Sequence, residues 1–285
     1  MLISNIFAIF LRALTLGSKF LLLLFMAKEL ETKDVAIYTL FLSSVVFSMY
    51  LIGVEFHNYL AREVLGKEVN YWSIYVRDSA IFFVLSYVVF IPILCMLFIF
   101  DILPYKYAPV FFLVLFVEHI SQECYKLLII MEKMIQANVV LFVRSGLWCY
   151  AAILLMMMDD SNKTLETIVI GWAFGGIASI FIFTSIIIKS KIEWKFWLRE
   201  KINFRWIAKG LPVAGLILIG TLAYRGIYFF DKILIKVLAE YEIIAVYGLF
   251  LSIVSVAQSF LETGIISYYY PRLVASYNQN LKSKF

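Results

Sequence analysis

The chain has 285 residues, of which 63% are hydrophobic, 18% aromatic and 16% charged, and its formal net charge is +5. A soluble domain is about 45–50% apolar. This composition therefore excludes an ordinary soluble enzyme or binding domain and indicates an all-α polytopic membrane protein. The three cysteines stand singly in separate apolar runs, without the spacing of a disulfide framework or a metal site.

Eight apolar runs are long enough to cross a bilayer as helices, which takes about 20 residues. In chain order, the expected spans cover residues 3–27, 35–56, 80–100, 108–130, 137–158, 168–188, 211–237 and 243–269. The first run is long and contains Arg12 and Lys19, so we interpret it as an uncleaved membrane helix and not as a secretory signal. The connectors are short and mostly polar, which leaves no room for a separate soluble domain.

The distribution of Lys and Arg predicts the orientation, because cationic loops resist translocation. If the N-terminus is cytoplasmic, most of the loop cations fall on the cytoplasmic side. We therefore expect both the N-terminus and the C-terminus to be cytoplasmic.

One apolar phrase occurs twice, as AIYTLFLSSVV at residues 36–46 and as AVYGLFLSIVS at residues 245–255. With an offset of 209 residues, seven of the eleven positions are identical, and each copy follows a short charged turn, KELETKD or KVLAEYE. Six expected spans separate the copies, so both point the same way across the membrane. Transporters with halves related by an axis along the membrane normal have this arrangement. The alternative is chance similarity between two apolar helices.

The repeat predicts a division of the chain into three parts. These are a six-helix lobe at 1–189, a basic and Trp-rich cytoplasmic interfacial linker at 190–210, and an incomplete second lobe of two helices and a tail at 211–285. A full second lobe needs four more spans, so we expect either a shortened form of a longer transporter or a chain that works with a partner. Basic residues beside Trp194, Trp197 and Trp206 suit an anionic membrane surface. The linker would serve there as an anchor or as a site that recruits a lipid head group.

The fourth expected span carries polar residues that share one side of a helix advancing 100° per residue. They are Glu118, His119, Gln122, Glu123 and Lys126. Charges at mid-membrane cost about 2.5–3.5 kcal/mol and usually face a bundle interior or a wet cavity. We expect this side to point away from lipid, opposite an apolar side with Val114, Leu115, Val117 and Ile120. It would form either a polar wall of a transport path, with ion-coupling roles for Glu118, His119 and Glu123, or an internal network that fixes helix packing.

Four cations lie well within the expected spans, away from their ends: Arg12, Lys19, Arg144 and Arg225. Arg guanidinium binds pyrophosphate-like anions with paired N–H donors, and Lys meets them as a point charge. We therefore expect these four to bind an anionic substrate group, with Lys19 and Arg225 as the first candidates. Alternatively, Arg12 reaches the membrane interface, and Arg225 pairs with Asp231 or with a carboxylate of the fourth span. Asp231 is a further candidate for ion coupling or for lining a cavity.

The repeat does not reproduce these charges, because Lys19 corresponds to Tyr228 and Arg225 to Leu16. A site between the copies would be asymmetric, as an amphipathic cargo with a charged head requires. Glu55 and His57 lie towards the end of the second expected span, where hydration at the membrane interface accounts for them.

The stretch LRALTLGSKFLLLLFMAKELETKDVAIYTLF, residues 11–41, resembles the opening of polysaccharide transporters of the O-antigen flippase type. These belong to the multidrug/oligosaccharidyl-lipid/polysaccharide exporter superfamily. The likeness continues at Leu211-Pro212, at Asp231-Lys232-Ile233-Leu234-Ile235 and at Tyr270-Pro271. Ala36 stands where the family has the Gly of a Gly-x-Tyr motif. The resemblance implies a multi-pass protein of the bacterial cytoplasmic (inner) membrane that moves undecaprenyl-pyrophosphate-linked oligosaccharide to the outer leaflet, in O-antigen, capsule or exopolysaccharide production and in lipopolysaccharide biosynthesis.

The implied partners are the lipid-linked oligosaccharide, membrane lipids, and the polysaccharide polymerase and chain-length machinery. No nucleic acid, cofactor or metal is expected, and the chain is not expected to be an enzyme, because it has no nucleotide-binding loop, GxSxG motif or metal-ligand cluster. A multidrug/cation antiporter of the same superfamily is the alternative, and would have an acid-dominated cavity. A membrane-embedded glycan polymerase or acyltransferase would need a sizeable outer loop. A non-functional remnant is the remaining alternative.

Overall fold

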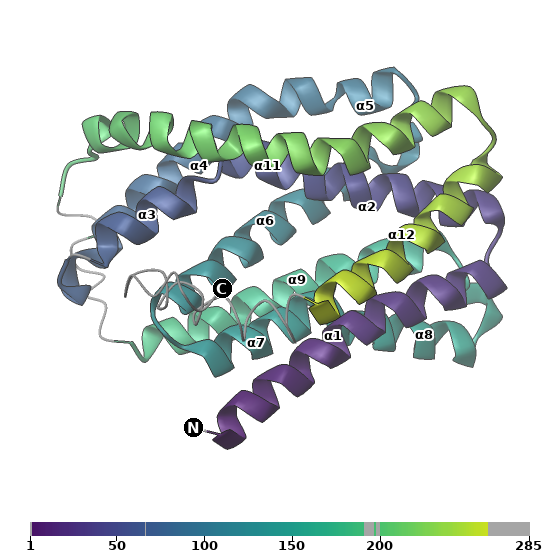
Figure 1. Ribbon diagram of the computed structural model, residues 1–285, viewed down its shortest axis with the longest axis horizontal. Helices are drawn as coiled ribbons and strands as arrows, with labels where there is room; N and C mark the ends of the chain where they lie inside the picture. Colours follow the sequence, from purple (N-terminus) through teal and green to yellow (C-terminus); the bar gives the residue numbers. More distant parts are fainter. Residues whose placement is uncertain (1, 66, 191–196, 198–199, 262–285) are drawn as a thin grey trace, which may run out of the picture.

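The computed structural model describes residues 2–65, 67–190, 197 and 200–261, and within these ranges every regular element is helical. The helices run back and forth along the long axis of the molecule (Figure 1). Six described stretches are long and apolar enough to cross a membrane: Phe10–Glu29, Thr32–Gly53, Trp72–Ile99, Met134–Met158, Leu165–Ile188 and Phe204–Leu238. The expected all-α, multi-pass class is confirmed at this level.

The main helices follow the expected order along the chain. They are α1 (Leu2–Glu29), α2 (Thr32–Gly53), α3 (Phe56–Val64), α4 (Trp72–Leu94), α5 (Met96–Ile99), α6 (Ala108–Ile130), α7 (Met134–Phe142), α8 (Trp148–Met158), α9 (Leu165–Ile188), α11 (Phe204–Leu238) and α12 (Tyr241–Leu261). Two of the eight expected spans are not among the six. They are α6, which carries several ionisable residues, and α12, whose described apolar stretch is Tyr241–Ser255. Residues 262–269 of the eighth expected span lie outside the described residues.

The second expected span ends at Gly53, three residues earlier than the apolar pattern suggested. Val54 and Glu55 follow with φ angles of 49° and 55°, in the left-handed region. A residue other than glycine costs about 1–3 kcal/mol there and persists only where its surroundings hold it in place. This break starts α3 in a new direction and brings Glu55 into the interior, where it is buried.

A π-helical segment, Val143–Leu147, joins α7 and α8 within one expected span. The wider turn changes the register of the side chains, so that Val143, Arg144, Ser145 and Gly146 are all buried. Such π-bulges occur frequently at functional sites. This one places an Arg side chain in the interior of the helix bundle.

Helix α6 occupies the middle of the bundle, in contact with α9, α2 and α7. Its polar side is directed towards other helices, as expected. The side with Val114, Leu115 and Val117 is buried as well, because neighbouring helices cover it. In the same part of α6, the large apolar side chains of Leu113 and Phe116 remain exposed.

The second copy of the repeated phrase packs directly against the first. Helix α12 contacts both α2 and α1, and α2 contacts both α11 and α12 (Figure 1). Helix α11 begins at Phe204, so the end of the expected 190–210 linker is already helical. There the Trp206 ring packs against Phe56 and Tyr59 of α3, with ring centroids 5.5 and 5.1 Å away. Residues 191–196 of the linker, Trp194 among them, lie outside the described residues.

Arg77, in the second turn of α4, holds the chain just before α11. Its guanidinium donates to the carbonyl oxygens of Trp197, Glu200 and Lys201 at 2.6–3.1 Å. It also pairs with the Asp78 carboxylate at 2.7 Å. Both side chains of this pair are buried. From the sequence, Arg77 was one of the cytoplasmic loop cations. Its neighbours in the chain do not reveal that it binds carbonyl groups more than 100 residues away.

Candidate functional site

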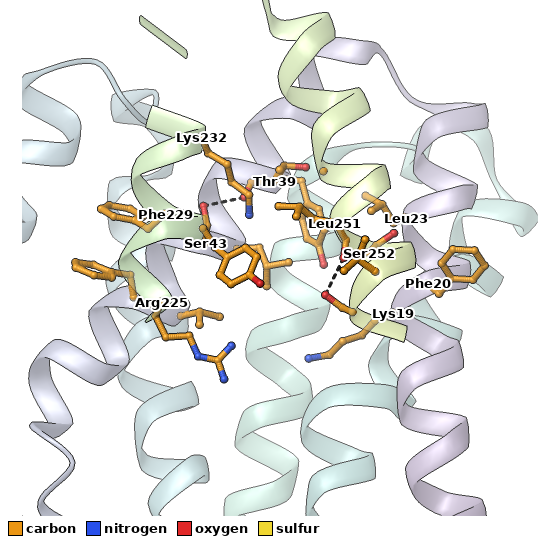
Figure 2. Close-up of a pocket in the computed structure, with 18 of the residues that line it drawn as sticks. Lys19, Phe20, Leu23, Thr39, Ser43, Arg225, Phe229, Lys232, Leu251 and Ser252 are labelled. Carbon is orange, nitrogen blue, oxygen red and sulfur yellow. Dashed lines mark hydrogen bonds between the residues drawn. The ribbon is translucent and has the colours of Figure 1, made fainter. Parts of the chain in front are cut away.

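A cavity of about 370 Å³ lies between α1, α2, α11 and α12. Three cations reach it, namely Lys19 of α1 and Arg225 and Lys232 of α11, and none of the described residues that line it is an Asp or a Glu. Figure 2 shows the side chains of Lys19 and Arg225 directed towards each other across the cavity, with Lys232 further along α11. The described lining of the cavity is therefore cationic, and the nearest carboxylates, Glu118 beside Lys19 and Asp231 beside Lys232, lie behind it.

These cations have few partners within the protein. The Arg225 guanidinium lies over the rings of Tyr50 and Tyr224, 5.3 Å from each centroid, in cation–π geometry. Lys19 and Lys232 have no hydrogen bond or ion pair with the residues that the structure describes, although the Lys232 side chain is only 8% exposed. The Asp231 carboxylate instead accepts a hydrogen bond from the Tyr247 hydroxyl at 2.9 Å. Arg225 is therefore paired neither with Asp231 nor with a carboxylate of α6.

The walls of the cavity come from equivalent positions of the two copies of the repeat. Most lining residues form pairs separated by the same 209 residues: Leu16 and Arg225, Lys19 and Tyr228, Phe20 and Phe229, Leu23 and Lys232, Thr39 and Gly248, Leu42 and Leu251, Ser43 and Ser252, and Val46 and Ser255. Three of these pairs are identical, namely Phe20 and Phe229, Leu42 and Leu251, and Ser43 and Ser252, whereas each of the three cations has an uncharged residue at the corresponding position. The lining therefore draws on corresponding positions but is asymmetric in charge.

Gly248 is in contact with its own equivalent in the other copy. A side chain at this position would overlap the Thr39 hydroxyl and methyl groups. Helices α2 and α12 therefore approach each other closely at corresponding positions of the repeated phrase, beside the cavity.

A first polar cluster joins α6 to the π-helical segment. Arg144 lies 3.6 Å from the Glu118 carboxylate and donates to the Gln122 side chain. Trp172 of α9 donates its indole N–H to Glu118 at 3.1 Å. Glu118 and Arg144 are only 5% and 7% exposed. Arg144 is held inside a buried network and is not among the residues that line the cavity, although it lies near Lys19.

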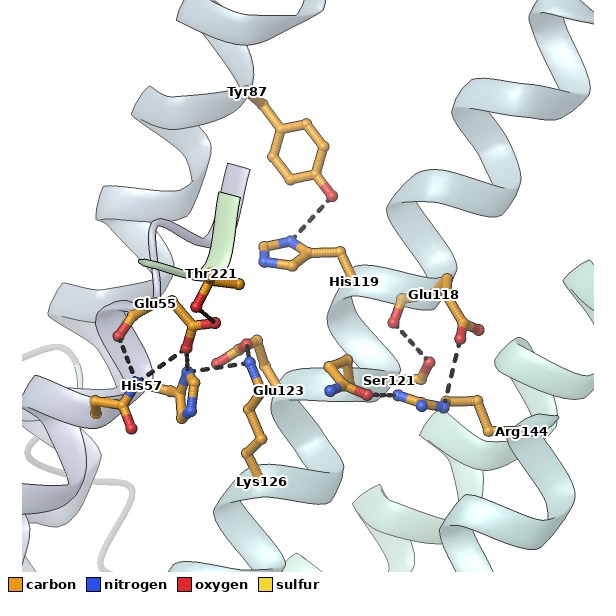
Figure 3. Close-up of polar contacts among 12 residues, drawn as sticks. Glu55, His57, Tyr87, Glu118, His119, Ser121, Glu123, Lys126, Arg144 and Thr221 are labelled. Carbon is orange, nitrogen blue, oxygen red and sulfur yellow. Dashed lines mark hydrogen bonds and ion pairs between the residues drawn. The ribbon is translucent and has the colours of Figure 1, made fainter. Parts of the chain in front are cut away.

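A second polar cluster joins α6 to the α2–α3 break and to α11 (Figure 3). The Lys126 ammonium lies 2.7 Å from the Glu123 carboxylate and 3.1 Å from the His57 Nδ1. His57 Nδ1 is also 3.5 Å from the Glu55 carboxylate, which accepts a hydrogen bond from the Thr221 hydroxyl at 3.1 Å. Interfacial hydration does not account for Glu55 and His57 as the sequence suggested, because both belong to this network.

His119 lies between α4 and the second cluster. Its Nδ1 is 3.1 Å from the Tyr87 hydroxyl, and its ring packs edge-on against Phe83. Its Nε2 is buried without a hydrogen-bond partner among the described residues, next to Gly53 at the end of α2. Buried polar atoms in proteins are normally hydrogen-bonded, so this nitrogen is a position where an ordered water or a ligand group would be bound.

The structure thus divides the expected site residues. It brings Lys19 and Arg225 together in the cavity, and it places Glu118, Gln122, Arg144, His119, Glu123 and Lys126 in the two polar clusters. Arg12 is exposed on α1, away from the cavity lining. Lys232 was missed because it lies near the end of the seventh expected span and was counted with the loop cations. The signal was its place in an apolar run, FFDKILIK.

None of the described clusters of His, Cys, Asp and Glu has the three ligands that a metal ion needs. Fold and site together define a multi-pass helical membrane protein with a cationic cavity among four helices. Comparison with protein-family models, curated proteins and solved structures finds no match to this chain. The cavity and its charges are therefore the basis for inferring a function.

Proposed function

We propose that the protein is a flippase that moves an undecaprenyl-pyrophosphate-linked oligosaccharide across the bacterial cytoplasmic membrane. The observation that carries the proposal is the cavity that Lys19, Arg225 and Lys232 line, with no Asp or Glu among the lining residues that the structure describes. A diphosphate carries concentrated negative charge, and cations in a low-dielectric site stabilise it strongly. Hydroxyl and aromatic side chains on the same walls suit the neutral sugars that follow the diphosphate.

The position of the cavity supports transport rather than surface binding. It lies among α1, α2, α11 and α12, whose lining positions correspond at the offset of 209 residues, and the sites of secondary transporters typically lie between repeated units. Under this proposal, residues 1–189 form a first lobe and 211–285 begin a second one. The chain would have eight spans, with α6 and α12 as the fourth and eighth, and both termini in the cytoplasm.

The multidrug/cation antiporter is the less favoured candidate. A binding site for organic cations requires carboxylates or bare aromatic faces, because three nearby ammonium and guanidinium groups repel a cationic ligand. Glu118 of α6, which lies near Lys19, is already paired with Arg144. Asp231, beside Lys232, accepts a hydrogen bond from Tyr247. This balance of charges favours an anionic cargo.

The test is a flipping assay in proteoliposomes with a fluorescent undecaprenyl-pyrophosphate-linked sugar as the probe. We expect K19Q and R225Q each to reduce the initial rate about tenfold or more, since each removes a charge-assisted contact of about 1.5–3 kcal/mol. R12Q is the matched control, because it removes an exposed cation from the same helix as Lys19 and should leave the rate unchanged. Unchanged rates in K19Q and R225Q would overturn the proposal. Transport of tetraphenylphosphonium instead of the lipid would favour the antiporter.

A further inference from the structure

The second polar cluster contains two carboxylates, one ammonium and one imidazole in mutual contact. Glu55 lies before α3, His57 is on α3, and Glu123 and Lys126 are on α6. Lys126 bridges Glu123 and His57, and His57 bridges Lys126 and Glu55 (Figure 3). Glu55 is buried, and the other three side chains are largely covered.

The donors and acceptors fix the protonation of this cluster. An ammonium group only donates hydrogen bonds. The contact between Lys126 and His57 Nδ1 therefore requires a lone pair on Nδ1, which leaves the imidazole neutral with its proton on Nε2. With both carboxylates ionised and Lys126 charged, one negative charge remains without a counterpart. A single additional proton would neutralise the cluster.

We propose that this cluster is a proton-binding site, and that a proton on His57 Nδ1 exchanges its partner from Lys126 to Glu55. The incoming proton binds the Nδ1 lone pair, so the Lys126 ammonium can no longer donate to it and keeps only Glu123. The new N–H then donates to the Glu55 carboxylate, which already lies 3.5 Å away. The N–H bond is the only covalent bond formed, the other changes are of hydrogen bonds, and the proton returns to water when the exchange reverses.

The groups around His57 favour the unprotonated imidazole in the arrangement that the structure describes. Burial lowers the pKa of His57 below its usual value, and the Lys126 ammonium lowers it further, while Glu123 and Glu55 oppose them. Among the described contacts, α11 contributes the neutral Thr221, and α3 contributes the neutral Asn58, whose amide donates to Glu55 at 2.9 Å. Helix α6 also carries His119, which lies near Glu123 and Lys126 and contacts the neutral Tyr87 of α4. Losing the Lys126 contact would remove the nearest cation acting against the proton. The two arrangements are therefore distinct states of one site.

Glu55 connects the second polar cluster to the cationic cavity through two helices, α2 and α11. It is the second of the two left-handed residues that end α2, which is the helix that supplies Thr39, Ser43 and other cavity walls. Its carboxylate also accepts the hydrogen bond from Thr221 of α11, one helical turn from Arg225. A carboxylate drawn towards a protonated His57 loses part of its bond to Thr221. Proton binding would thereby shift α11 relative to α3 and alter the position of Arg225.

As the ion-coupling site of a transporter this inference rests on the proposed function, whereas proton binding at His57 does not. The chain has two histidines, so ¹⁵N-histidine labelling yields two sets of imidazole signals, one for each residue. The set that disappears in H57Q belongs to His57. In lipid nanodiscs titrated from pH 8 to pH 4, we expect His57 to change protonation below pH 6.5. A His57 that stays neutral throughout overturns the proposal.

Two variants with opposite expected effects identify the partners. K126M removes the nearby cation and should raise the midpoint of the His57 titration by about one pH unit, and E55Q should lower it by a similar amount. E63Q, which removes a carboxylate from the same helix that bonds Trp206 instead, should leave the midpoint unchanged. A midpoint that does not respond to K126M and E55Q contradicts the partner exchange.

The link to α11 has its own measurement, which needs no substrate. Spin labels at the exposed positions Arg62 of α3 and Ile219 of α11 report the distance between these helices. We expect the distance distribution to change between pH 7.5 and pH 5, to stay fixed in H57Q, and to show the low-pH form at both values in T221V. Protonation of His57 without a change in this distance overturns the coupling. Because no flipping is measured, failure here and failure of the flippase proposal are separate results.

Discussion

The Glu118–Arg144 pair illustrates how much a single buried charge depends on its partner. The two side chains are almost fully enclosed, and Gln122 and Trp172 complete their hydrogen bonds. A buried ion pair adds little net stability over an apolar replacement, but removing one member leaves a charge stranded in a low-dielectric interior. Arg144 is thus a structural cation, while Lys19 and Lys232 remain available to a ligand.

This difference predicts unequal effects of removing cations. We expect R144M to lower the free energy of unfolding by about 3–5 kcal/mol, because Glu118 then remains as an unpaired buried charge. The E118Q/R144M double variant should recover much of this loss, since neither charge remains. Unfolding in mixed micelles by titration with sodium dodecyl sulfate measures both. R12M, which removes an exposed cation of α1, is the control, and an equal loss in R12M would contradict the interpretation.

At the scale of elements, two features direct the chain in ways that apolar patterning does not reveal. The π-helical segment turns Arg144 inwards, and the left-handed pair Val54 and Glu55 ends α2 and starts α3. Each costs local strain that tertiary contacts must offset. Both lie beside a polar cluster, so the irregular backbone and the buried polar side chains depend on each other.

The start of α11 depends on Arg77 in α4. Replacing it with Gln removes charge-assisted hydrogen bonds to three carbonyl groups, each worth about 1.5–3 kcal/mol. We expect R77Q to speed tryptic cleavage after Lys201 about tenfold or more, because local opening becomes easier. Limited proteolysis in detergent micelles is the measurement. R62Q, a change of an exposed Arg on α3, should cleave at the original rate. Equal rates in R77Q and the unaltered protein would show that Arg77 does not hold this segment.

The close contact of α2 with α12 depends on Gly248. A methyl group there overlaps Thr39, so G248A should destabilise the protein by about 1–3 kcal/mol, as overpacked cores do. T39A opens the space, and the T39A/G248A double variant should therefore be more stable than G248A alone. Thermal unfolding of the four proteins completes the double-mutant cycle. Additive effects of the two changes would indicate that α2 and α12 do not meet at these positions.

At the scale of the whole molecule, the central question is whether α6 crosses the membrane despite its charges. Its ionisable residues are covered by α9, α2 and α7, so lipid meets mainly apolar atoms. Intramembrane charges are tolerated where they face a bundle interior in this way. We therefore expect α6 to cross the membrane because neighbouring helices cover its charges, although its hydropathy alone does not indicate a span.

Cysteine labelling in whole cells tests this topology. In a background without Cys95, Cys124 and Cys149, single cysteines at Lys106 and at Lys133 mark the two ends of α6. We expect a membrane-impermeant maleimide to label position 106 from outside and position 133 only after the cells are opened, as the positive-inside rule predicts. Labelling of both positions from one side would mean that α6 does not cross.

The sequence by itself determined the features that follow from solvent and periodicity. Apolar runs of membrane length identified the helical, multi-pass class, because a backbone in lipid must satisfy its hydrogen bonds internally. The repeat of 209 residues pointed to the matching walls of the cavity, and the rarity of intramembrane cations singled out Lys19 and Arg225.

Only the tertiary structure decided which charges are paired and which are free. Arg144 and Arg225 look alike in the sequence, yet Arg144 meets Glu118 and Gln122, and Arg225 meets two tyrosine rings beside a cavity. The second polar cluster likewise joins Glu55 and His57 to residues of α6 about 70 positions away. Such pairings depend on helix packing and on breaks like the one at Val54, and local sequence patterns carry no record of either.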